Sequence, residues 1–209
     1  MPSQDLGRLR HPTRRRILDA AERLFASQGF ESATVDDIAA AAGVSKSHLY
    51  YHFPAKTSLL EGLIRLRTSE LLADKAALLD GQGPALGCDS SELSETLTKA
   101  ITDVLAPRRD FIRVVLVEAI RNPGATRPVF EAVTATLDDV AARLDAAGHT
   151  VAEGERDAWL FLGILPALYL VALTEPEDLS IKARSLGSEL GRWESAYLAG
   201  GPGIQSDHS

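Results

Sequence analysis

The sequence predicts an all-α protein. Apolar residues recur at three- and four-residue spacing along most of the chain, which is the period of an amphipathic helix. Alternating apolar and polar patterns long enough for strands are absent from the sequence. Hydrophobic residues make up 45% and charged residues 24% of the 209 residues, which is an ordinary globular composition. We therefore expect about nine helices, with flexible tails at residues 1–11 and 200–209.

The first helix is predicted over Pro12–Gln28, with Gly29 as its stop. Its apolar face consists of Ile17, Ala20, Ala21, Leu24 and Phe25. Because these residues share one face of the helix, we expect them to form the core of a three-helix N-terminal head at residues 12–55.

Two short helices are predicted to follow the first. Thr34 is a natural N-cap, and the two aspartates after it place negative charge where it interacts favourably with the helix dipole. This helix is expected to end at Gly43, and Ser45 is expected to cap a third helix that runs to about Phe53. Two helices joined by a short turn that contains glycine are typical of a helix-turn-helix.

A larger helical body is predicted at residues 56–199. A long helix from Lys56 to about Leu79 links the head to this body. Gly81–Asp89 has the composition of a loop, and Asn122–Gly124 is typical of a turn. The other body helices are predicted at about Ser91–Leu105, Pro107–Arg121, Arg127–Ala147, Glu153–Leu173 and Glu177–Leu198.

The distribution of charge favours nucleic acid as a partner, although the formal net charge is -7. Residues 1–67 hold ten Lys/Arg against seven Asp/Glu, whereas residues 68–209 hold twelve against twenty-two. DNA binding requires Lys and Arg to neutralise phosphates. A basic head on an acidic body is therefore the expected arrangement.

A motif of spaced residues runs through the head. It consists of Thr13, Ile17, Ala20–Ala21, Leu24–Phe25, Gly29–Phe30, Thr34–Val35, Ile38–Ala39, Ala42–Ser45, Leu49–Phe53, Lys56 and Leu59–Leu60. Over about 48 residues without a gap, this motif closely resembles the TetR family of bacterial repressors. The resemblance implies a homodimer that binds operator DNA, with an effector-binding and dimerisation body of helices.

The third helix is expected to present its polar face to DNA. Leu49 and Phe53 lie one turn apart and should pack inward. An α-helix enters the major groove with its N-terminal residues at the base edges, which predicts direct readout by Lys46, Ser47 and His48. The resemblance implies phosphate contacts by Thr34 and Lys56. The full set of predicted DNA contacts is Thr34, Ser45, Lys46, Ser47, His48, Tyr50, Tyr51, His52 and Lys56.

The arginines near the N-terminus and two histidines of the head each have two possible roles. Arg8, Arg10 and Arg14–Arg16 could reach the DNA backbone or minor groove, or they could be a solvated basic segment. His48 and His52 are four residues apart and could hold a metal ion, but phosphate contact or simple exposure is favoured. No metal, cofactor or catalytic residue is expected.

The cellular location is expected to be the cytoplasm. The single Cys88 cannot form an internal disulfide and is expected to be an inert thiol, and no secretory signal is visible. The apolar run Ala158–Leu173 is shorter than the roughly 20 residues needed to span a bilayer.

Aromatic and aliphatic residues of the body are candidates for an effector pocket, although core packing explains each of them nearly as well. The candidates are Phe111, Val115, Phe130, Trp159, Phe161 and Tyr169. The expected effector is small and partly apolar.

The last helix carries a sustained apolar seam with a parallel row of small residues, which predicts close approach of a partner helix. With two residues of the preceding helix, the predicted dimer interface is Trp159, Leu162, Leu179, Ala183, Leu186, Gly187, Leu190, Gly191, Trp193 and Tyr197. An intramolecular seam is the alternative.

The sequence therefore predicts a repressor that an effector releases from a pseudo-palindromic operator. Two alternatives remain. One is a DNA-binding regulator controlled by a protein partner or by its abundance, and the other is an all-α enzyme with a vestigial head.

Overall fold

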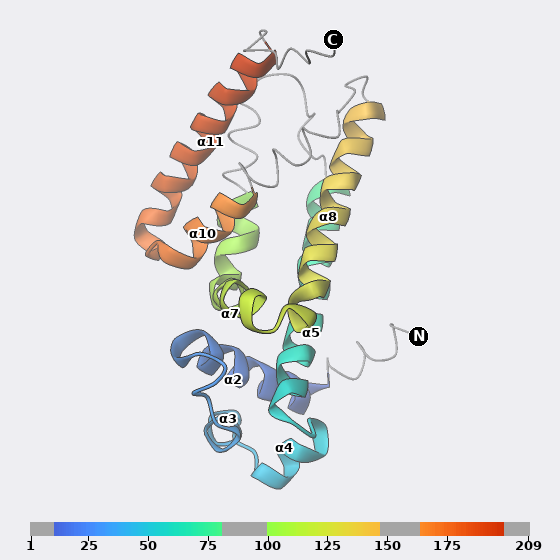
Figure 1. Cartoon of the computed structure of the whole chain (residues 1–209), viewed down its shortest axis with the longest axis vertical. Coiled ribbons are helices and arrows are strands. Elements are labelled where there is room, and N and C mark those ends of the chain that lie inside the picture. Colours follow the sequence, from blue (N-terminus) through green and yellow to red (C-terminus); the bar gives the residue numbers. More distant parts are fainter. Residues whose placement is uncertain (1–10, 81–99, 147–163, 199–209) are drawn as a thin grey trace, which may run out of the picture. The chain divides into compact units, whose positions relative to one another are not determined.

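The structure is a computed structural model that describes residues 11–80, 100–146 and 164–198 of the chain. Every regular element within these ranges is helical, which confirms the predicted all-α fold (Figure 1). The α-helices are α2 (Pro12–Gln28), α3 (Val35–Ala42), α4 (Lys46–His52), α5 (Lys56–Asp80), α7 (Arg109–Arg121), α8 (Pro123–Ala146), α10 (Leu165–Leu173) and α11 (Pro176–Leu198). A π-helix, η1 (Ala100–Leu105), and a 3-10 turn, η2 (Ala106–Arg108), precede α7.

Two compact units make up the chain. The first unit comprises residues 1–77 and 108–140, and the second comprises residues 78–107 and 141–209. The predicted head at residues 12–55 lies within the first unit together with most of α5, all of α7 and most of α8. The boundary at residue 55 stays a prediction.

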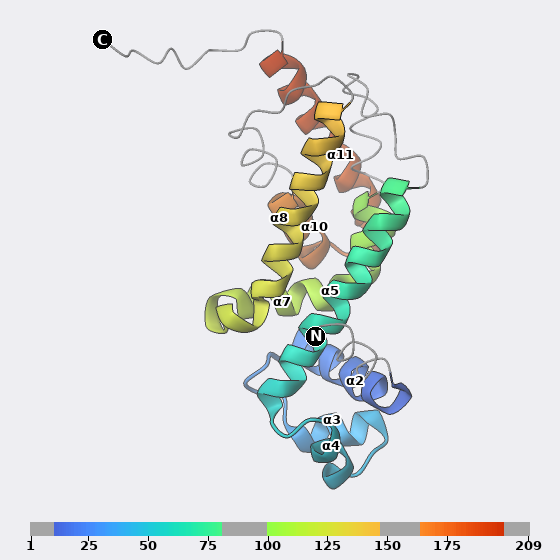
Figure 2. The same ribbon diagram turned by 90° about the vertical axis from the view of Figure 1, so that its right-hand side faces the viewer.

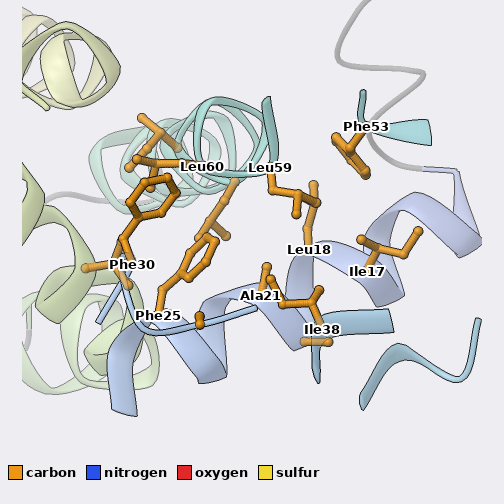
Figure 3. Packing of buried hydrophobic residues seen from close by; sticks show 14 of the residues in the cluster. Ile17, Leu18, Ala21, Phe25, Phe30, Ile38, Phe53, Leu59 and Leu60 are labelled. Atoms are coloured by element: carbon orange, nitrogen blue, oxygen red, sulfur yellow. The ribbon is translucent and has the colours of Figure 1, made fainter. Parts of the chain in front are cut away.

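The first unit is held together by one hydrophobic cluster. In Figure 2, α2, α3 and α4 gather around the first turns of α5. Figure 3 shows side chains of α2 and α5 facing one another, with Phe25 and Phe30 beside Leu60. The rings of Phe25 and Phe30 meet edge to face with their centroids 5.2 Å apart. Helix α7 packs on α2 and adds Phe111 and Val114 to the same cluster.

The corner between α7 and α8 differs from the sequence-based prediction. Helix α7 ends at Arg121 and α8 begins at Pro123, so the turn predicted over Asn122–Gly124 is confined to Asn122. The carbonyl oxygen of Asn122 accepts from the amide of Ala125 over 3.0 Å. Proline at the first helical position needs no hydrogen-bond acceptor, and its fixed φ suits a helix start. A single residue therefore makes the corner.

The second unit contains α10 and α11, which contact each other and η1. Val171 of α10 and Ala183 of α11 are fully buried. Among the described side chains of these two helices, the large apolar ones that are exposed are Tyr169, Leu173 and Ile181. None of the helices in the described part of the chain is long and apolar enough to cross a membrane.

Candidate nucleic-acid interface

The start of α3 is fixed by Thr34. The hydroxyl oxygen of Thr34 accepts from the amide of Asp37 over 3.1 Å and donates to the Asp37 carboxylate over 2.6 Å. The cap satisfies one of the amides left open at a helix start, and the carboxylates of the first turn interact favourably with the helix dipole. The sequence-based prediction of this N-cap is confirmed.

The turn between α3 and α4 depends on Gly43. Its φ of +64° lies in the left-handed region, where a glycine carries no steric penalty. The Gly43 amide donates to the carbonyl of Ala40 over 3.1 Å, and the Val44 amide donates to that of Ala39 over 3.0 Å. This pair of bonds is the Schellman motif, which ends a helix and turns the chain sharply. It sets the direction in which α4 leaves α3.

Helix α4 presents nearly all of its side chains to solvent. Ser45 caps its start by accepting from the amide of His48 over 3.2 Å. Among the residues of α4, only Leu49 is buried, at 0% exposure, whereas Tyr51 is 82% exposed. The predicted base-reading and phosphate-contacting residues Lys46, Ser47, His48, Tyr50 and Tyr51 are all exposed. One buried residue therefore anchors a helix whose other faces remain available to a partner.

Lys46 forms an exposed ion pair with Asp36 across the turn. Its Nζ atom lies 2.8 Å from the Asp36 carboxylate, and the hydrogen bond raises the pKa of the lysine. Exposed ion pairs of this kind are weak, because solvent screens both charges. The ion pair therefore holds Lys46 only weakly at the start of α4.

His48 and His52 lie side by side on α4. Their Nε2 atoms are 3.2 Å apart, close enough for a hydrogen bond with one donor and one acceptor. Burial lowers the pKa of His52, and His48, Arg14 and His11 act in the same direction. Within residues 11–80, 100–146 and 164–198, no group of three or more His, Cys, Asp or Glu side chains could hold a metal ion.

The side chain of Lys56 contacts backbone carbonyl groups. Its ammonium donates to the carbonyl oxygens of Phe30 over 2.8 Å, Glu31 over 3.1 Å and Ala33 over 3.3 Å. It also lies 4.5 Å from the centroid of the Phe30 ring. An ammonium has three protons to donate, and three acceptors surround this one. Lys56 thus secures the segment that leads into α3, and the phosphate contact implied by the resemblance stays a prediction.

An ionic cluster missed by the sequence analysis joins α2 to α5. Arg67 of α5 donates to Asp19 over 2.6 Å, to Glu22 over 2.7 Å and to Glu70 over 2.8 Å. Burial raises the pKa of Glu22, and Arg67 opposes that effect. Burial lowers the pKa of Arg67, but the Glu22 and Glu70 carboxylates raise it by more, so the net shift is upward. The three-residue spacing of Asp19 and Glu22 on one helix is the signal that could have identified this cluster.

The predicted effector-pocket residues that the structure describes belong to both units. Phe111 and Val115 belong to the core of the first unit, whereas Phe130 is 46% exposed. Tyr169 lies in the second unit and is 55% exposed. Trp159 and Phe161 lie outside the described residues. The pocket stays a prediction, and core packing accounts for Phe111 and Val115.

Part of the predicted dimer seam lies on the buried face of α11. Leu179, Ala183, Gly187 and Gly191 are buried within one chain, and Leu186 is half-buried. The side chains of Leu190, Trp193 and Tyr197, and the residues Trp159 and Leu162, lie outside the described part of the structure. Small residues at four-residue spacing permit close helix approach inside a chain as well as between chains. Their burial favours the intramolecular alternative for the four inner residues.

Known proteins resemble this chain in sequence and in fold. Residues 17–63 match the family described as "Bacterial regulatory proteins, tetR family". The HTH-type transcriptional regulator SrpR of Pseudomonas putida is 42% identical over 114 residues, which cover 54% of this chain and 49% of SrpR. The HTH-type transcriptional regulator TtgW, also of Pseudomonas putida, is 42% identical over 54% of this chain and 78% of TtgW. The match thus spans about half the length of SrpR and most of that of TtgW.

Two solved structures share the fold over most of the chain. Salmonella enterica GusR is 26% identical with a TM-score of 0.63, and the match covers 90% of this chain and 96% of GusR. The transcriptional regulator FadR from Bacillus subtilis, solved in complex with stearoyl-CoA, is 16% identical with a TM-score of 0.63. That match covers 83% of this chain and 97% of FadR.

Proposed function

Because this chain belongs to the TetR family of bacterial regulatory proteins, we propose that it is a transcriptional regulator that binds operator DNA through α3 and α4. The observation that carries the proposal is the exposure of α4. This helix is capped by Ser45, anchored by Leu49 and polar on its remaining faces. A helix of this kind fits the major groove of DNA. In this proposal the chain acts in the cytoplasm and performs no catalytic step.

The residues of α4 divide into two roles. Lys46, Ser47 and His48 occupy its first turn, the part of a recognition helix that meets base edges. Tyr50 and Tyr51 lie further along and offer hydroxyl groups to phosphates. The ion pair with Asp36 keeps Lys46 near the start of the helix. Base readout by the first turn and backbone contact by the tyrosines follow from this arrangement.

The proposed regulator works as a homodimer. A pseudo-palindromic operator presents its half-sites about 34 to 36 Å apart, so two heads must be held at that spacing. Because the inner face of α11 is buried within the chain, the surface proposed for the partner is the one that exposes Tyr169, Leu173 and Ile181. These three side chains lie on two helices that contact each other, and a contiguous exposed apolar patch marks a contact with another chain.

A small, partly apolar effector is proposed to release the repressor from DNA. The stearoyl-CoA complex of the similarly folded FadR supports a ligand of this type. An effector can release DNA only if it prefers the conformation whose head spacing does not match the operator. Shifting such an equilibrium from 1:99 to 99:1 requires about 5.5 kcal/mol of differential affinity.

DNA binding is tested with a duplex that the full chain selects from a random-sequence pool. Replacing Lys46 or Tyr50 by alanine should weaken binding by about 1 to 3 kcal/mol for each side chain that bonds DNA, measured by fluorescence anisotropy. Lys182→Ala removes the same charge from an exposed position on α11 and should leave the affinity unchanged. Unchanged affinity in both α4 variants would contradict the assignment of α4 as the recognition helix.

The effector is sought by thermal shift with a panel of metabolites and drugs that includes stearoyl-CoA. A ligand that raises the melting temperature should also lower the affinity for the selected duplex. If stabilising ligands leave DNA binding unchanged, release by an effector is excluded for them. The alternative stated from the sequence, control by a protein partner or by the abundance of the regulator, would then be favoured.

A further inference from the structure

Arg14 of α2 reaches the far end of α4. Its Nη2 atom donates to the carbonyl oxygen of His52 over 2.5 Å, across 38 residues of sequence. The guanidinium carbon lies 4.9 Å from the centroid of the Phe53 ring. Phe53 is itself buried at 2% exposure and caps the end of α4. Arg14 therefore joins the first helix of the head to the last residue of the proposed recognition helix and to the residue after it.

This contact lies at the C-terminal end of α4, where carbonyl groups lack hydrogen-bond partners within the helix. The last four carbonyl groups of any helix lack partners within the helix, and α4 spans only Lys46–His52. A positive group at a helix C-terminus also interacts favourably with the helix dipole. Since Leu49 is the only buried residue of α4, a second attachment at its C-terminal end fixes the tilt of the helix as well as its position.

We propose that Arg14 is a positioning residue for DNA recognition, which holds the C-terminal end of α4 against α2 and does not itself contact DNA. This proposal rests on the DNA-binding function proposed above. It assigns Arg14 a role different from that of its exposed neighbour Arg16, which lies on the same helix.

The surroundings of Arg14 favour an internal role over a phosphate contact. The side chain is half-buried, one terminal nitrogen is engaged with His52, and the Nε atom is buried without a hydrogen-bond partner. Reaching a phosphate would require the guanidinium to leave both the His52 carbonyl and the Phe53 ring. Arginine is suited to this place because its planar group can stack on a ring and donate at its edge at once.

The decisive experiment measures the dissociation constant of the full chain for its selected duplex at several salt concentrations. Arg14→Ala should raise this dissociation constant about tenfold at each salt concentration, because the C-terminal end of α4 is no longer held against α2. The slope of the logarithm of the constant against the logarithm of salt should stay at the wild-type value. Loss of a phosphate contact would lower that slope by about 0.9.

Two further variants serve as controls. Arg16→Ala removes the same charge from an exposed position of α2, so it reports the effect of charge without the α4 contact. Arg14→Lys keeps the charge but lacks the planar group, and should bind DNA more like Arg14→Ala than like the wild type.

Affinity for bulk calf thymus DNA, which depends mainly on charge, should fall much less in Arg14→Ala than affinity for the selected duplex.

A second readout tests the placement of Arg14 without DNA. Arg14 is one of the groups that lower the pKa of His52, together with burial, His48 and His11. The ring protons of His52, followed by NMR across a pH titration, should report a higher pKa in Arg14→Ala, and no change in Arg16→Ala. A merely stabilising residue elsewhere in the head would not move this titration.

Each outcome decides between the roles. A lower salt slope, or full rescue by lysine, would identify Arg14 as a phosphate contact and overturn the proposal. An unchanged affinity of Arg14→Ala would also overturn the proposal, because Arg14 would then have no role in DNA binding. Failure of the wild-type chain to select any duplex would instead refute the proposed function. In that case the His52 titration would still show whether Arg14 holds α4.

Discussion

The ammonium of Lys56 lies 2.8 Å from the carbonyl oxygen of Phe30, 26 residues earlier in the chain. This contact ties the start of α5 to the segment between α2 and α3. Lys56→Met keeps the aliphatic stem but leaves three carbonyls without their donor, and should lower the free energy of unfolding by about 1 to 3 kcal/mol. Chemical denaturation measures the loss.

Lys182→Met, at an exposed site of α11, is the matched control and should change stability by less than about 0.5 kcal/mol. If Lys56→Met is as stable as the wild type, yet binds DNA with a smaller dependence on salt, then Lys56 contacts phosphate instead.

Arg67 should be among the most sensitive residues of the first unit. Arg67→Met leaves Asp19, Glu22 and Glu70 facing one another without their shared cation. Removing one partner of a fully buried ion pair costs about 3 to 5 kcal/mol. Because Arg67, Asp19 and Glu70 are partly exposed, the expected loss is about 1 to 3 kcal/mol, measured as the change in the free energy of unfolding by urea. Arg23→Met, at an exposed site of α2, should have little effect. Equal free energies of unfolding for Arg67→Met and Arg23→Met would show that the ionic cluster does not stabilise the fold.

His52 should make the stability of the head depend on pH. Because its pKa in the folded chain is lowered from 6.5, the unfolded chain binds a proton first as the pH falls. Its contribution to stability is complete above about pH 6.5 and declines below it, towards the pKa of the folded chain. Urea unfolding of the wild type at about pH 7.5 and about pH 5.5 should differ more than that of His52→Gln. Identical differences would show that His52 does not contribute to the pH dependence.

The two faces of α11 should respond differently to substitution. Ile181→Glu places a charge on the exposed apolar face and should raise the dimer dissociation constant about 30-fold or more, measured by sedimentation. Gly187→Leu instead forces a large side chain into the buried face and should lower the melting temperature. Lys182→Ala, on a neighbouring exposed face, should leave assembly unchanged. Monomers from Gly187→Leu with an unchanged melting temperature would return the interface to the inner face.

Local signals in the head were sufficient to predict its framework. The caps Thr34 and Ser45, and the glycine that ends α3, act within a few residues of their own position, and the structure has each of them in the predicted role. The long-range contacts could not be predicted in this way. Nothing near Lys56 in the sequence indicates that it meets the carbonyl of Phe30, and Arg14 appears only as one of three consecutive arginines.

The body shows the limit of periodicity more clearly. The spacing of Leu179, Ala183 and Gly187 correctly indicates a face that packs closely against something. Periodicity does not say whether the neighbour belongs to the same chain. Likewise, an aromatic residue such as Phe111 has the same pattern in a core as in a pocket, and the structure places it in the hydrophobic cluster of the first unit.

The minimal anchoring of α4 by Leu49 has a consequence for evolution and for engineering. Because the other side chains of the helix lie outside the core, Ser47 and His48 can be exchanged without repacking the interior. Under the base readout proposed for these residues, new operator preferences would arise by single substitutions at little cost in folding. The head is a scaffold for libraries in which these two positions vary while Leu49, Ser45 and Gly43 are kept.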